Sequence, residues 1–223
     1  MKIRGPLVTL GAVAALGVGI LIANISQENQ SAAPATPVAE SPTPTAAAQA
    51  PTPSTPTTPP APPAFPVKAD YVGKIPISSG VITLEITIDG EKAVAYACDG
   101  NTVEVWLSGR AKNDVLNLAN KGNTSRLEGR HEGNAVVGTL SIDQKSWDYK
   151  AAAVQDPAGL YVYQDDDGVR SSWIVDANQG VTGVQRQADG STAPAPTLLT
   201  DGTAVIDGRE TTVTRVEGDS DVT

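Results

Sequence analysis

The sequence predicts an all-β domain, an antiparallel meander that closes into a barrel or stacks as a sandwich. From residue 67 onward, apolar and polar side chains alternate with period two, as in the stretch 81–89, VITLEITID. Turn dipeptides such as Asp89-Gly90 separate the alternating segments. The turns recur at intervals of roughly 8–12 residues, which is typical of sandwiches and barrels.

An uncharged apolar run precedes this domain at residues 6–25, PLVTLGAVAALGVGILIANI. About 20 apolar residues suffice to cross a hydrocarbon core of roughly 30 Å. Lys2 and Arg4 precede the run, and no basic residue follows it before Lys68. The positive-inside rule therefore predicts a single-pass membrane helix with residues 1–5 in the cytoplasm and the remaining chain outside.

A cleaved secretory signal is the alternative interpretation of the same run. The apolar region of such signals usually spans about 7–15 residues and ends at a small-x-small site. This run is longer, and Asn24 and Ile25 stand where small residues would be expected. The sequence favours the uncleaved signal-anchor in the cell membrane. Cleavage would make the protein secreted.

Residues 26–66 read as a linker, because 12 of the 17 prolines lie between Pro34 and Pro66. The segment is otherwise mostly Ala, Thr and Ser, so it lacks the apolar side chains that offset the entropy of folding. We expect it to be disordered and extended, with a reach of roughly 120 Å in polyproline II conformation. Its Thr-Pro content fits an O-glycosylated stalk or an unmodified tether.

The combination of a basic start, one apolar span, an Ala/Pro/Thr-rich linker and a Gly-rich β domain resembles exported, membrane-anchored envelope proteins of actinobacteria, mycobacteria in particular. The resemblance concerns the architecture of the whole chain. It implies an envelope protein of unassigned function, with O-mannosylation of the threonines in 36–58, and it carries no catalytic motif.

Within the exported part, the alternating pattern predicts a β domain over residues 67–217 and an acidic tail over 218–223. Residues 113–121 fit a short helix, although a strand is favoured. Pro157-Ala158-Gly159 interrupts the pattern and would separate two small β subdomains. The segment 191–200, STAPAPTLLT, is predicted to be a loop, because proline is poorly accommodated in strands.

The aromatic residues of the domain are few, and five of them are the candidate contacts for a ligand or partner. They are Trp106, Trp147, Tyr161, Tyr163 and Trp173. Aromatic side chains are first of all large core residues, so structural packing is the competing interpretation and the favoured one.

Catalytic and metal-binding residues are not indicated. His131, the single histidine, is expected at an exposed hairpin tip, without a nucleophile or orienting residue beside it. Cys98, the single cysteine, is expected to be a small buried hydrophobe. The run Asp165-Asp166-Asp167 lacks the alternate spacing of a calcium loop and fits a solvated turn. We therefore expect no catalytic residue, cofactor or metal.

The net charge of −9 lies entirely in residues 67–223, since Lys2 and Arg4 balance Glu28 and Glu40. Such an acidic balance argues against nucleic-acid binding. The sequence thus favours a non-enzymatic, membrane-anchored envelope protein whose β domain binds a ligand or partner or has a structural role. The alternative is an envelope glycan hydrolase with paired carboxylates, because any two of the many acidic residues could form such a pair.

Overall fold

The computed structural model describes residues 64–221, and these form an all-β structure that contains a closed antiparallel barrel and no helix. The predicted fold class and the barrel alternative are thereby confirmed. The predicted membrane helix at 6–25 lies outside the described residues, as does nearly all of the linker. Within 64–221, no helix has the length and apolar character needed to cross a membrane.

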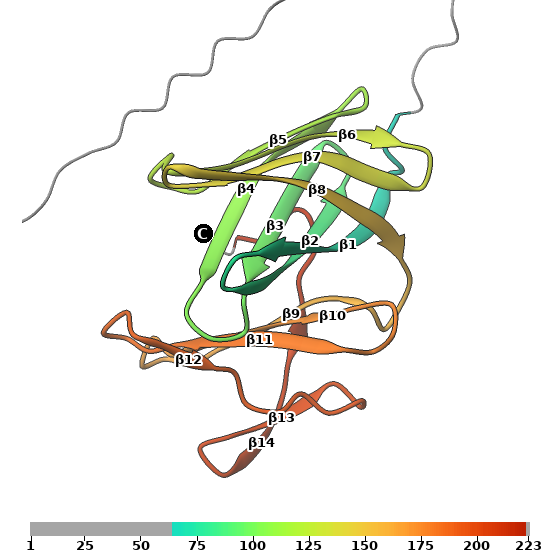
Figure 1. Cartoon of the computed structure of the whole chain (residues 1–223). Helices are drawn as coiled ribbons and strands as arrows, with labels where there is room; N and C mark the ends of the chain where they lie inside the picture. The colour runs from blue at the N-terminus through green and yellow to red at the C-terminus, as the bar shows by residue number, and fades with distance from the viewer. Residues whose placement is uncertain (1–63, 222–223) are drawn as a thin grey trace, which may run out of the picture. The chain divides into compact units, whose positions relative to one another are not determined.

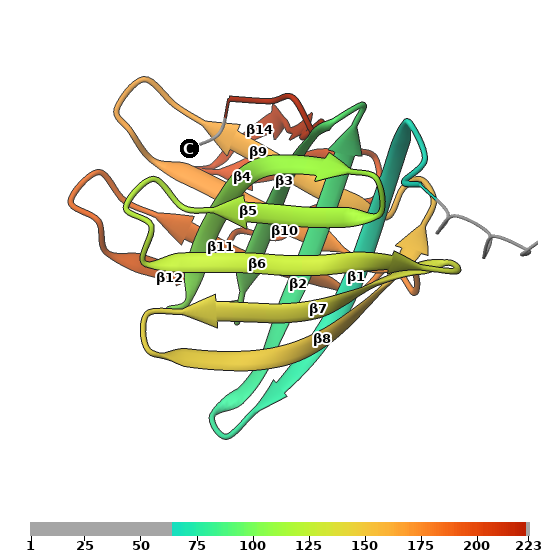
Figure 2. The same ribbon diagram turned by 90° about the horizontal axis from the view of Figure 1, so that it is seen from above.

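Eight strands form the barrel in sequence order, each paired with the next, and β8 pairs with β1 to close it (Figure 1). From the side β5–β8 form one layer above β1–β4, and from above they run across them (Figure 2). The bounds of these strands are β1 (Lys68–Ile77), β2 (Gly80–Asp89), β3 (Lys92–Cys98), β4 (Glu104–Lys112), β5 (Val115–Ala119), β6 (Ser125–Glu132), β7 (Ala135–Ile142) and β8 (Lys145–Val154). The 113–121 segment thus contains a strand rather than a helix.

Apolar side chains fill the interior of the barrel. Alternate residues of β2, from Ile82 to Ile88, are at most 1% exposed and belong to this core. Three alanines of β3, at 93, 95 and 97, face the same interior. Small residues also let the strands approach each other, because a Cβ on Gly138 would overlap the carbonyl of Glu128 in β6.

A second sheet covers the outer face of β1–β4 (Figure 1). Its strand order is β12-β11-β10-β9-β15. The bounds are β9 (Gly159–Gln164), β10 (Arg170–Val175), β11 (Val181–Arg186), β12 (Thr192–Pro194) and β15 (Thr214–Arg215). The barrel ends at Val154 and this sheet begins at Gly159, so the Pro157 segment connects the two sheets.

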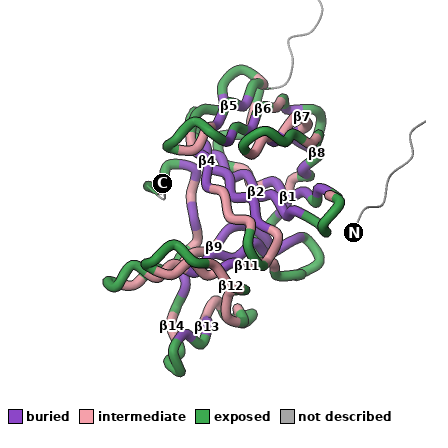
Figure 3. Tube along the Cα trace, turned by 60° about the vertical axis from the view of Figure 1, so that its left-hand side comes forward, coloured by how far each residue is buried: buried purple, intermediate pink, exposed green. Residues whose placement is uncertain are grey.

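Because of this second layer, β2 is buried on both of its faces. Thr83, Glu85 and Thr87, the polar positions of the alternating pattern, are at most 3% exposed. Val94, Tyr96 and Cys98 of β3 join the apolar contact between the layers. Figure 3 shows β2 coloured as buried along most of its length, in agreement with its burial pattern.

A short hairpin, β13 (Thr203–Ile206) and β14 (Arg209–Thr212), lies on the other face of the second sheet. Ala204 and Ile206 pack there against Trp173. The loop expected over 191–200 is corrected in its first part, because Thr192–Pro194 pairs with the end of β11 as an edge strand. An edge position tolerates Pro194, since an edge strand hydrogen-bonds on one side only.

Candidate functional site

The five candidate aromatic residues do not converge on one site. Tyr161, Tyr163 and Trp173 lie together on the outer face of the second sheet, in the cluster that includes Ala204 and Ile206. Trp106 lies in the interface between barrel and second sheet, where its ring centroid is 4.6 Å from that of Tyr96. Trp147 packs against the barrel core from β8, beside a hollow at the barrel end.

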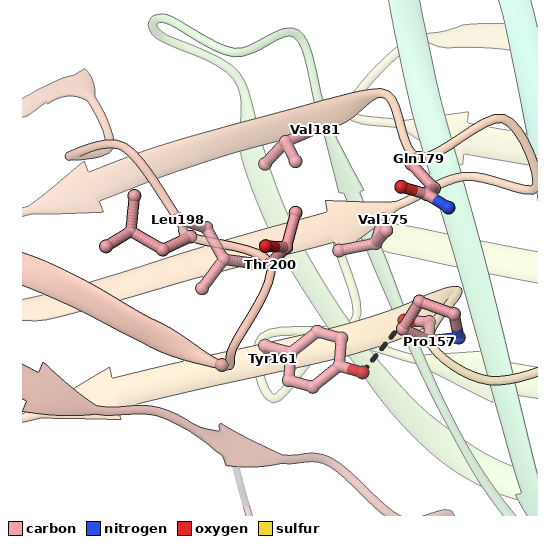
Figure 4. Close-up of a pocket in the computed structure, with 9 residues that line it drawn as sticks. Pro157, Tyr161, Val175, Gln179, Val181, Leu198 and Thr200 are labelled. Carbon is pink, nitrogen blue, oxygen red and sulfur yellow. Dashed lines mark hydrogen bonds between the residues drawn. The ribbon is translucent and has the colours of Figure 1, made fainter.

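The hairpin β13–β14 leaves part of the outer face of the second sheet uncovered, and a groove of about 250 Å³ lies there (Figure 4). We call it the outer-sheet groove. Tyr161, Val175 and Val181 line it from three neighbouring strands. Its complete lining is Pro157, Tyr161, Val175, Gln179, Val181, Leu198, Leu199, Thr200 and Gly202.

Tyr161 is held in place by polar contacts at its hydroxyl. The hydroxyl donates a hydrogen bond to the Pro157 carbonyl at 2.8 Å, drawn in Figure 4. Nη1 of Arg215 donates to the same oxygen at 3.0 Å, and the guanidinium lies 5.5 Å from the ring centroid. The aromatic wall is therefore fixed by Pro157, which also lines the groove, and by Arg215, which does not.

The opposite wall is a hydrogen-bonded loop rather than a strand. The Leu199 amide donates to the Thr203 carbonyl at 2.7 Å, and the Gly202 amide donates to the Leu199 carbonyl at 3.1 Å. The Asp201 carboxylate accepts from the Thr203 amide at 3.0 Å, which closes the turn. These bonds hold the Leu198–Leu199 pair at the groove.

Two apolar side chains at the groove remain exposed to solvent, Val181 by 46% and Leu199 by 43%. Sequence reasoning identified Tyr161 and missed the aliphatic residues of this groove. The signal available in the sequence was the Leu198-Leu199 pair, two adjacent large apolar residues in a segment of Ser, Thr, Ala and Pro.

His131 does not lie at an exposed hairpin tip, so that expectation was wrong. It is 9% exposed within β6, and its ring centroid lies 5.1 Å from that of Phe65 and 6.0 Å from that of Tyr71. The turn Gly133-Asn134 begins two residues later. Phe65, which is remote in sequence, covers the imidazole, and a local pattern could not reveal this.

Cys98 is fully buried between the barrel and the second sheet. Burial raises the pKa of its thiol from the ordinary value to about 12. At neutral pH the thiol is therefore protonated and a poor nucleophile.

Among residues 64–221 no cluster of three or more His, Cys, Asp or Glu side chains has the geometry to hold a metal ion. Asp165 accepts a hydrogen bond from the Val169 amide at 2.8 Å within the β9–β10 turn.

Glu85 of β2 and Asp70 of β1 lie on paired strands, at the face of the barrel that the second sheet covers. Burial, followed by the neighbouring Asp70, raises the pKa of Glu85 well above its ordinary value. Both carboxyl oxygens of Glu85 are shielded from solvent. A glycosidase pair needs both carboxyls at a substrate cleft, and Glu85 has no exposed atom with which to contact a sugar.

The described residues form a barrel with a second β-sheet packed on it, and an apolar recess lies on the outer face of that second sheet. Comparisons with protein-family models, with curated proteins and with solved structures give no match. The function is therefore argued from the geometry and the sequence of this chain.

Proposed function

We propose that this protein is a membrane-anchored docking module of the cell envelope, and that the outer-sheet groove receives an apolar side chain of a partner protein. The single observation that carries the proposal is the pairing of an apolar recess with the solvent-exposed Val181 and Leu199 at its edge. Exposed aliphatic groups grouped at a recess favour a contact surface, because isolated surface leucines have no such neighbour.

The size of the groove favours a single anchoring side chain. Pockets for drug-sized ligands usually measure about 300–1,000 Å³ and bury most of the ligand. The groove, at about 250 Å³, is smaller. A few anchors that fill such recesses supply most of the binding energy in many protein interfaces.

The walls of the groove support docking without rearrangement. Tyr161 is bonded to both Pro157 and Arg215, and the Leu199 loop is closed by its own backbone hydrogen bonds. A preformed recess lowers the ordering cost of association. The apolar run at 6–25 and the proline-rich segment support a location outside the membrane, where the partner would be another envelope protein.

We infer further that the protein acts without catalysis. The Cys98 thiol is buried and protonated, and Phe65 and Tyr71 cover the imidazole of His131. Neither group borders the outer-sheet groove, so this recess has no nucleophile with an imidazole or thiolate beside it.

The test is site-specific photo-crosslinking in cells, with the photoreactive residue at Leu199 of the full-length chain. The matched control position is Val115, which is 39% exposed on β5 of the barrel. We expect one dominant adduct from position 199, weakened by Val181→Asp and absent from position 115. An identical adduct pattern at both positions would contradict the groove as the docking site. Turnover of a cell-wall glycan by the purified protein would contradict the non-enzymatic function.

A further inference from the structure

A second, charged site lies between the barrel and the second sheet, away from the outer-sheet groove. Its centre is Glu104 at the start of β4, whose side chain is completely buried. Nε of Arg186 in β11 donates to this carboxylate, and Nη2 of Arg170 in β10 lies 3.6 Å from it. The barrel therefore supplies the acid, and the second sheet supplies two arginines.

Neutral donors complete the surroundings of the Glu104 carboxylate. The Trp106 indole donates at 3.2 Å, and the hydroxyls of Tyr96 and Ser172 each lie 3.5 Å from the same oxygen. With these contacts and the two arginines, both oxygens of the carboxylate are engaged. Arg170 also stacks over the Trp106 ring, 5.0 Å from its centroid, so Trp106 orients this arginine as well as the acid.

Two guanidinium groups share the single carboxylate of Glu104. Arginine stays protonated at all physiological pH values, so two positive charges face one negative charge. The arginine side chains are 22% and 35% exposed, hence partly removed from water.

A hollow of about 270 Å³ adjoins these arginines and adds a third cation. Lys121, in the turn between β5 and β6, lines it together with Arg170, Arg186 and Trp106. Glu104 is the one acidic residue among the eight that line the hollow. Among the eight lining residues, three cationic side chains and one anionic side chain give an excess of two positive charges, in a chain whose net charge is −9.

We propose that this hollow binds a phosphate monoester. Such a group carries about −1.5 to −2 charges at pH 7, which matches the local excess. Arginine presents a planar fork of donors that suits phosphate oxygens, and lysine adds a point charge. The phosphate could belong to a soluble metabolite or to a lipid headgroup, and the chemistry that recognises it is the same. This inference is independent of the docking groove.

The competing explanation is an ion cluster that only joins the barrel to the second sheet. It predicts that added anions have no specific effect. Lys121 separates the two explanations, because it is exposed, lines the hollow and has no part in the contacts to Glu104. Replacing Lys121 should weaken phosphate binding and leave the contacts between the barrel and the second sheet intact.

The experiment is calorimetric titration of the full-length chain in non-ionic detergent. Inorganic phosphate, glycerol phosphate and short-chain phosphatidic acid are the ligands, and acetate is the control anion. The variants are Lys121→Gln and the control Lys145→Gln, an exposed lysine at the β7–β8 turn. We expect phosphate binding that weakens about tenfold in Lys121→Gln, the size of a lost charge-assisted hydrogen bond. Lys145→Gln should bind as the unmodified chain does.

Tighter binding of phosphatidic acid than of glycerol phosphate would identify the membrane as the source, and the reverse would identify a soluble ligand. No saturable heat with any phosphate, equal responses to acetate and phosphate, or unchanged binding in Lys121→Gln would each overturn the proposal. Arg170→Lys keeps the charge and removes the planar fork, so it should also weaken phosphate binding. Thermal unfolding of each variant shows whether it remains folded.

Discussion

Arg215 of β15 donates a hydrogen bond from Nη2 to the Asp70 carboxylate of β1 at 2.9 Å, which ties the last strand of the second sheet to the first strand of the barrel. The same guanidinium bonds the Tyr161 hydroxyl and the Ala158 carbonyl. One side chain therefore joins the two sheets and positions the aromatic wall of the outer-sheet groove.

Replacing this residue, Arg215→Met, should destabilise the fold by about 1–3 kcal/mol, because it leaves the partly buried Asp70 carboxylate without its cation. Urea unfolding followed by tryptophan fluorescence measures the change. Arg209→Met is the matched control, since Arg209 is an exposed arginine of β14, and it should change stability by less than about 0.5 kcal/mol. Equal stability of the two variants would refute the joining role.

The buried Glu85 should make stability depend on pH. Its pKa is raised in the folded protein and ordinary in the unfolded chain, so the unfolded state releases its proton first as the pH increases. The folded protein therefore loses stability as the pH rises from about 4.5 towards the raised value, by at most about 1.4 kcal/mol per pH unit.

The variant Glu85→Gln removes this titration and keeps the side-chain size. We expect the stability advantage of Glu85→Gln over the unmodified protein to grow between pH 4 and pH 8, as measured by urea unfolding at each pH. The matched control is Glu128→Gln, the same substitution at an exposed position of β6. A constant difference for Glu85→Gln over the same range would show that Glu85 is ionised in the folded state.

Gly138 should tolerate no side chain, because an added Cβ would overlap the Glu128 carbonyl and the backbone of Gly129. Gly138→Ala should therefore cost about 1–3 kcal/mol through strain in the β6–β7 pairing. Gly122→Ala is the matched control, since its Cβ would meet only the Thr124 methyl at 3.9 Å. Thermal unfolding compares the two, and similar melting temperatures would mean that the barrel adjusts at Gly138 without cost.

The Cys98 thiol should resist alkylation in the folded protein. Its pKa of about 12 lies roughly three units above the ordinary value, so at pH 8 the reactive thiolate is about a thousandfold scarcer, before any effect of limited access. Iodoacetamide labelling followed by mass spectrometry measures the rate, with the urea-unfolded chain as the control. Comparable rates in the two states would place Cys98 at the surface.

The local features of the fold could be predicted from sequence because they depend on neighbouring residues. The alternation in 81–89 predicted the strand that became β2, and Asp89-Gly90 predicted the turn after it. His131 shows the limit of such reasoning. The nearby Gly133-Asn134 turn suggested exposure, whereas Phe65, more than sixty residues earlier, covers the ring.

The sequence by itself determined that residues 67–217 alternate as strands and that glycine-containing turns connect them, since both properties depend on side chains within a few positions. Only the tertiary structure decided which polar positions are buried and which residues meet. Glu104 and Arg186 are separated by 82 residues and form one ion pair, and Tyr161 faces Leu198 across the groove. Such contacts depend on how two sheets stack, and no short-range pattern specifies that arrangement.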